Sequence, residues 1–96
     1  MRWDVKFTRQ ASKQTGEASD RVLLSLQLLI ADLESKGPAP GKHWQHYGKL
    51  VGKKSEDKRH CHLVKGNPTY VCCWKVCKVE KRIEVYYVGT HEKAPY

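Results

Sequence analysis

The last nine residues of the chain gather groups that can transfer protons and bind anions. Thr90, His91, Lys93 and Tyr96 bring together a hydroxyl, an imidazole, an ammonium and a phenol directly after an expected strand. Loops that follow rigid strands commonly carry functional side chains, and an imidazole titrates near neutral pH. A chain end can instead fray, or its terminal tyrosine can serve only in packing. Composition alone leaves both interpretations open.

Two more histidines lie on a strand expected near residues 59–65. Because side chains alternate between the two faces of a strand, Cys61 and Leu63 share one face. His60 and His62 share the other. If the cysteine face packs against helices, both imidazoles project from the open face, where they can meet a ligand. The alternative is a pair of structural histidines without a catalytic role.

A run of cations follows two aromatic residues in the middle of the chain. Lysine and arginine number 18 against 10 acidic residues, a formal charge of +8, so RNA, DNA or an acidic protein is the expected partner. Such a run suits a phosphate backbone, and the aromatic rings can stack on bases. A solvated edge strand that resists aggregation is the alternative. The aromatic residues are His46 and Tyr47, and the cations are Lys49, Lys53, Lys54, Lys58 and Arg59.

The cysteines are interpreted as small buried hydrophobic residues. They lack paired C-x-x-C spacing, and a cytosolic setting disfavours disulfides. A zinc ion shared with His60 and His62 is the alternative, but Cys72 and Cys73 would point to opposite faces of one strand. No metal or other cofactor is therefore expected. The four residues are Cys61, Cys72, Cys73 and Cys77.

The sequence predicts a cytoplasmic protein that makes no membrane contact. It opens without the apolar run of a signal peptide, and polar residues interrupt the apolar segment 22–33. At 96 residues the chain suits one domain, over 1–96, with one core.

Two helices and several strands must position these groups. Alternation of Trp3, Val5 and Phe7 predicts an N-terminal strand. A short helix is expected over residues 9–17. A longer one begins at Ser19 and Asp20, runs to about Lys36 and is stopped by Gly37 and Pro38, and its apolar stripe must pack against another element.

A loop over 37–47 precedes four further strands, expected near 47–53, 59–65, 69–79 and 82–88. The expected fold is α+β, with the N-terminal strand and with two helices packed on one face of a four- to five-stranded antiparallel sheet. The opposite face is then available for function.

Two segments, His60–Val76 and Ile83–Tyr96, resemble the cytotoxic translational repressors of the RelE/ParE toxin-antitoxin superfamily. The likeness in element order spans nearly the whole chain. The pairing of Cys61-His62-Leu63 with Gly89-Thr90-His91 is most similar to the histidine-using YafQ branch. The resemblance implies a RelE-like fold and an mRNA interferase, a toxin that cuts mRNA, often on the ribosome, without a metal. Cleavage would proceed by attack of the ribose 2′-hydroxyl on the adjacent phosphate.

The resemblance also implies roles for single residues. His62 and His91 would act as base and acid, in an unassigned order, and Tyr96 would orient the 2′-hydroxyl or stack on a base. Lys93 would only attract phosphate. A cognate antitoxin would cover the basic face with an acidic or amphipathic segment, giving a hetero-oligomer. The residues expected to bind phosphate are Lys49, Lys53, Lys54 and Arg59.

The sequence departs from that family at two places. Tyr86-Tyr87-Val88 stands where relatives carry a phosphate-binding arginine, and Gly66-Asn67 lies near an acidic position of the histidine branch. A lysine from elsewhere then supplies the missing charge, or activity is reduced. Two other functions stay open: a ParE-type inhibitor of DNA gyrase, which does not need the histidines, and a basic RNA-binding module that never cuts.

Overall fold

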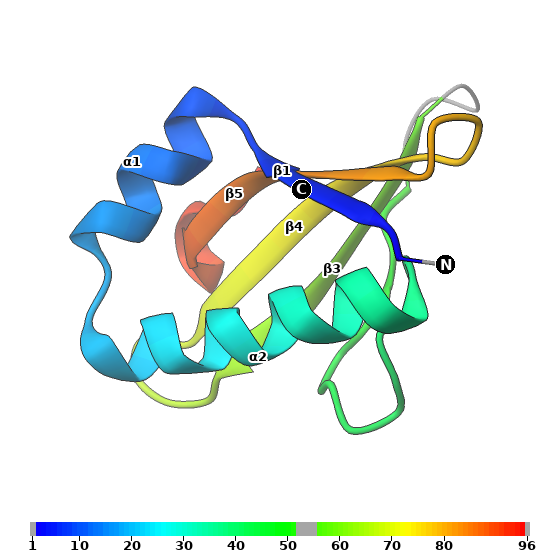
Figure 1. Ribbon diagram of the computed structural model, residues 1–96. Coiled ribbons are helices and arrows are strands. Elements are labelled where there is room, and N and C mark those ends of the chain that lie inside the picture. The colour runs from blue at the N-terminus through cyan, green and yellow to red at the C-terminus, as the bar shows by residue number, and fades with distance from the viewer. Residues whose placement is uncertain (1, 52–55, 96) are drawn as a thin grey trace.

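The computed structural model describes residues 2–51 and 56–95, so the predictions for Lys53, Lys54 and Tyr96 lie outside the described residues. Two helices pack on one face of a five-stranded sheet (Figure 1). This arrangement confirms the expected α+β fold with its helices on one side. The other face of the sheet carries no α-helix among the described residues.

The helices are α1, Arg9–Glu17, and α2, Asp20–Lys36, as predicted. Thr8 caps α1 by accepting a hydrogen bond from the Ala11 amide, and Ser19 caps α2 in the same way. Gly37 ends α2 at φ +90°, and a Cβ there would lie 2.9 Å from the Trp3 indole nitrogen. Neither helix in the described part of the chain is long and apolar enough to span a membrane.

The sheet has the strand order β1-β5-β4-β3-β2. Neighbouring strands are antiparallel except that β1 runs parallel to β5, so the sheet is mixed rather than wholly antiparallel. Alternation fixes which face of β1 is apolar but leaves its direction free, which explains this difference. The strands are β1 Asp4–Phe7, β2 Gly48–Lys49, β3 Asp57–Val64, β4 Tyr70–Cys77 and β5 Arg82–Thr90.

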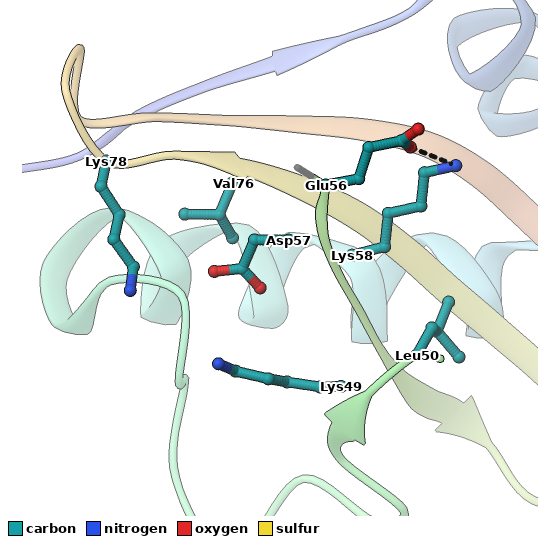
Figure 2. Close-up of a pocket in the computed structure, with 7 residues that line it drawn as sticks. All are labelled: Lys49, Leu50, Glu56, Asp57, Lys58, Val76 and Lys78. Carbon is teal, nitrogen blue, oxygen red and sulfur yellow. Dashed lines mark ion pairs between the residues drawn. The ribbon is translucent and has the colours of Figure 1, made fainter. Parts of the chain in front are cut away.

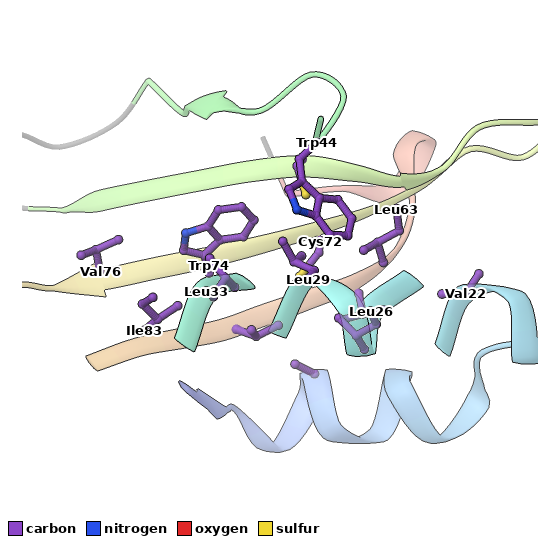
Figure 3. Close-up of a cluster of buried hydrophobic side chains, with 14 residues drawn as sticks. Val22, Leu26, Leu29, Leu33, Trp44, Leu63, Cys72, Trp74, Val76 and Ile83 are labelled. Carbon is purple, nitrogen blue, oxygen red and sulfur yellow. The ribbon is translucent and has the colours of Figure 1, made fainter. Parts of the chain in front are cut away.

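The main core lies between α2 and the sheet (Figure 3). Leu29 and Leu33 of α2 are fully buried against Trp74 of β4 and Ile83 of β5. Cys61, Cys72 and Cys73 are fully buried free thiols, which confirms their interpretation as small core residues. Cys77 is a free thiol that is only half-buried. Burial raises the pKa of the Cys61 thiol to about 12.

A β-bulge in β5 changes which side chains reach the open face. Cys73 pairs with Tyr87 while Trp74 pairs with Val85, so Tyr86 is the extra residue. Val85 and Val88 both face the helices. Tyr86 and Tyr87 instead pack on the opposite face, against Cys73.

Candidate active site

Four imidazoles gather around one end of the open face, with His62 of β3 at their centre. The His46 ring stacks on the His62 ring, with centroids 4.2 Å apart and planes 26° apart. His91 meets His62 edge-on at 5.4 Å, and His60 lies 6.4 Å away. The two histidines predicted to act in catalysis are therefore in ring contact, although nearly thirty positions separate them.

The loop before β2 brings His46 to this cluster. Its Trp44 side chain is buried in the core, and the indole nitrogen donates to the Asp32 carboxylate of α2 at 2.8 Å. The His62 amide then donates to the Gln45 carbonyl at 2.9 Å, which continues the pairing of β3 beyond β2. His46 itself has φ 57°, a left-handed conformation that a non-glycine residue adopts only when its surroundings impose it.

The end of β5 fixes the position of His91. The His91 amide donates to the Thr69 carbonyl at 2.8 Å, and a short 3-10 helix, η1, covers His91–Lys93. Just before it, the Tyr87 hydroxyl donates to the Thr90 carbonyl at 2.7 Å. The Tyr87 phenol also fills the space above Gly89, where a Cβ would lie 2.6 Å from its oxygen.

Burial keeps two of the imidazoles neutral near neutral pH. Loss of water contact lowers the pKa of His62 below 6.5, and the neighbouring His46, His91 and His60 lower it further. Burial also lowers the pKa of His60, whose Nδ1 lies 3.2 Å from the Gly48 carbonyl. Because a carbonyl only accepts, Nδ1 carries the proton and Nε2 is the acceptor in neutral His60. A neutral imidazole can take a proton from a substrate hydroxyl.

Other residues predicted to bind RNA lie on the helix side of the sheet. Arg59 is buried and donates to both Asp57 carboxylate oxygens at 2.9 Å and to the Tyr47 hydroxyl at 2.9 Å. Tyr47 stacks on Trp74. The Arg59 hydrogen bonds hold the pKa of Asp57 below its usual range. The prediction that Arg59 and Tyr47 bind RNA therefore requires both to leave these partners.

Lys49 shares that side, because it is the register partner of Arg59. It lines a cavity of about 430 Å³ together with Asp57 and Lys78 (Figure 2). Figure 2 shows Glu56 and Lys58 paired with each other and pointing away from that group. The predicted phosphate-binding lysine Lys49 is thus separated from the histidines by the sheet, whereas Lys93 follows His91 within η1.

Sequence reasoning missed part of this arrangement. Lys58 stands two residues before His60 and four before His62, so strand alternation already places it on the histidine face. The stacking of His46 on His62 has no such signal, since it depends on the path of a loop. Among the described residues, no three histidine, cysteine or acidic side chains are arranged to hold a metal ion.

A five-stranded mixed sheet with two helices on one face and polar groups on the other places the chain in the RelE-like class of α+β folds. Its structure is similar to that of an archaeal RelE-RelB complex from Pyrococcus horikoshii, with a TM-score of 0.78 and 20% sequence identity, covering 98% of this chain and 100% of that one. A metal-bound toxin from Helicobacter pylori gives a TM-score of 0.71 at 18% identity, covering 95% and 97% of the two chains.

The isolated RelE toxin of E. coli is a third similar structure, with a TM-score of 0.65 at 17% identity, covering 97% of this chain and 88% of that one. No protein-family model matches the sequence, and no curated protein is significantly similar to it. At these identities the likeness establishes the RelE fold, and function must be inferred from the site.

Proposed function

We propose that this protein is the toxin of a type II toxin-antitoxin system and acts as an mRNA interferase, a metal-independent endoribonuclease that stops translation. The observation that carries the proposal is the contact of His62 with His91, inside a cluster of imidazoles on the open face of a RelE-fold sheet. The formal charge of +8 favours a polyanionic substrate. RNA, bound on the ribosome in the cytoplasm, is the proposed substrate.

The geometry supports a division of labour between the two histidines. His62, whose pKa is lowered, takes the proton from the ribose 2′-hydroxyl. The 2′ oxygen then bonds to the adjacent phosphorus and the bond from phosphorus to the 5′ oxygen breaks, leaving a 2′,3′-cyclic phosphate. His91, at the exposed rim of the cluster, donates a proton to the departing 5′ oxygen. Tyr96 orients the 2′-hydroxyl or stacks on a base.

A cognate antitoxin is the second proposed partner. The archaeal structure that this chain resembles is a complex of RelE with RelB. An acidic or amphipathic segment that covers the open face would block access of RNA to the histidines. A small acidic protein encoded beside this one, co-purifying with it and suppressing cleavage, is the expected finding.

Cleavage can be tested by incubating purified protein with programmed ribosomes and mapping new mRNA 5′ ends. His62→Ala and His91→Ala should each lower the rate by about 10²-fold or more. His43→Gln is the matched control, because His43 is exposed and hydrogen-bonded to Asp32, outside the ring contacts of His62. Cleavage that is unchanged in both histidine variants would overturn the proposal. If the protein still arrests growth with both histidines substituted, and DNA gyrase is captured with it in pull-downs, the alternative of a ParE-type gyrase inhibitor would be favoured.

A further inference from the structure

We propose that a cavity on the open face, distinct from the one that Lys49 lines on the helix side, binds the backbone phosphate next to the scissile phosphate. The cavity measures about 540 Å³, and Arg9, Lys58 and Lys93 line it together with Tyr86 and Tyr87. This inference rests on the proposed function, because it supplies the anion contact that an RNA-cleaving site at the histidines needs. Of the cationic run it uses Lys58, whereas Lys49 and Arg59 face the helices.

The tyrosines form rigid walls for this cavity. The β-bulge in β5 directs both rings to the open face, and bulges next to functional sites commonly redirect a side chain in this way. The Tyr86 hydroxyl is hydrogen-bonded to the Cys73 thiol, and burial raises the Tyr86 pKa, so the phenol stays protonated. The Tyr87 hydroxyl is engaged by the Thr90 carbonyl. The phenol groups are therefore occupied, and the cations are left to bind an anion.

Lys58 is held in the lining of the cavity by two contacts. Its ammonium lies 5.4 Å from the centre of the Tyr86 ring, a cation–π contact. It also pairs with the Glu56 carboxylate at 2.8 Å (Figure 2). The side chain is 39% exposed, so the ammonium remains accessible to a ligand. A phosphate would compete with Glu56 for this ammonium, and the cost of displacing the carboxylate sets part of the affinity.

Arg9 and Lys93 approach the same space from two other elements. Arg9 is the first residue of α1, where the helix dipole favours an anion and an acidic side chain would stabilise the helix better. Lys93 is the last residue of η1 and is exposed. No acidic residue lines the cavity in the described part of the chain. Three cations from three elements without a lining acid are the chemistry of a phosphate site.

The cavity is placed so that one RNA strand can reach both it and the histidines. His60 pairs with Cys73, and Cys73 pairs with Tyr87, so the three side chains form one row across β3, β4 and β5. Lys93 follows His91 by two residues. A strand whose scissile phosphate lies at His62 and His91 would therefore place an adjacent phosphate near Lys93 and Lys58.

The test measures binding of a 2′-O-methyl RNA oligonucleotide, which cannot be cut, by fluorescence anisotropy over a range of salt concentrations. Lys58→Gln and Lys93→Gln should each weaken binding about tenfold or more, the scale of one charge-assisted hydrogen bond. The salt dependence should fall by about 0.7 in log–log slope, as expected for one lost phosphate contact on a single strand. Lys36→Gln makes the same charge change on α2 and should leave binding nearly unchanged.

Glu56→Gln gives a result that a purely structural role of Lys58 would not produce. Without the carboxylate beside it, Lys58 should bind the oligonucleotide more tightly.

In cleavage assays, Lys58→Gln and Lys93→Gln should raise KM and leave kcat unchanged, whereas His62→Ala should lower kcat. Lysine variants that bind like Lys36→Gln would overturn the phosphate site while leaving the interferase intact. If binding depends on Lys58 and Lys93 but His62→Ala and His91→Ala leave the cleavage rate unchanged, the interferase would be overturned and the phosphate site would stand. A wild-type chain that neither binds the oligonucleotide nor cuts mRNA on programmed ribosomes would overturn both.

Discussion

His46 and His62 stack ring on ring at 4.2 Å, although one belongs to an irregular loop and the other to strand β3 of the sheet. The loop is held to α2 through Trp44 and Asp32 and to β3 through Gln45. The stacked ring shields one side of His62 from water and adds a second titratable group beside it. His46 is thus part of the environment that sets the basicity of His62, and its left-handed backbone follows from this placement.

Removing the His46 ring should raise the pKa of His62 towards 6.5. In His46→Ala, water reaches the exposed face of His62, and one neighbour that disfavours its protonation is lost. The measurement is an NMR titration of the His62 ring protons in both proteins. His43→Ala serves as the control, because its ring contacts Trp44 and not His62. An unchanged His62 titration in His46→Ala would show that the stacking does not affect its basicity.

The folded protein should lose stability in mild acid because of its buried imidazoles. The pKa values of His60 and His62 are lowered on folding, so the unfolded chain binds protons more readily below pH 6.5. Their contribution to the free energy of unfolding is therefore present above that pH and is lost as the pH falls towards the folded-state pKa. Urea titrations at about pH 8 and about pH 5, above the range of most carboxylates, should show the difference. The fall in the free energy of unfolding should be smaller in His62→Gln than in the wild type. An equal fall would show that other groups cause it.

Periodicity was sufficient to predict the elements that frame the site. The apolar spacing of α2 and the caps at Ser19 and Gly37 are local features, so its bounds follow from neighbouring residues. Alternation along β3 also separates Cys61 from His62, which determines the face on which the imidazoles lie. The same rule places Lys58 beside the histidines and Arg59 away from them.

Interactions between distant segments could not be predicted in this way. The side on which Lys49 lies is unknown until the register of β2 is known, and its pairing with Arg59 places it on the helix face. The β-bulge at Tyr86 breaks simple alternation in β5. The position of His46 depends on hydrogen bonds from a loop to α2 and β3, which no local pattern encodes.

Arg59 should matter for stability more than for RNA binding. In Arg59→Ala the hydrogen bonds to Asp57 and Tyr47 are lost, and the half-buried Asp57 carboxylate loses its main partner. The free energy of unfolding should fall by about 2 kcal/mol or more, the scale of hydrogen bonds to a charged group. Lys49→Ala, at its register partner, removes an exposed charge and should change it by less than about 0.5 kcal/mol. Urea denaturation of both variants provides the comparison; a stable Arg59→Ala that no longer binds RNA would restore Arg59 as a phosphate ligand.

Gly89 should tolerate no side chain, because the Tyr87 phenol lies over it. A Cβ at this position would be 2.6 Å from the Tyr87 oxygen, so Gly89→Ala must push the phenol away from the Thr90 carbonyl. Overpacking of this kind costs about 1–3 kcal/mol, and it disturbs the turn that positions His91. Thermal unfolding and RNA cleavage should both be impaired. Gly16→Ala is the matched control: nothing lies within 4 Å of its added Cβ in α1, so that variant should gain about 0.5–1 kcal/mol. Equal melting temperatures for the two variants would mean that Tyr87 adjusts without strain, and that its bond to Thr90 does not hold His91 in place.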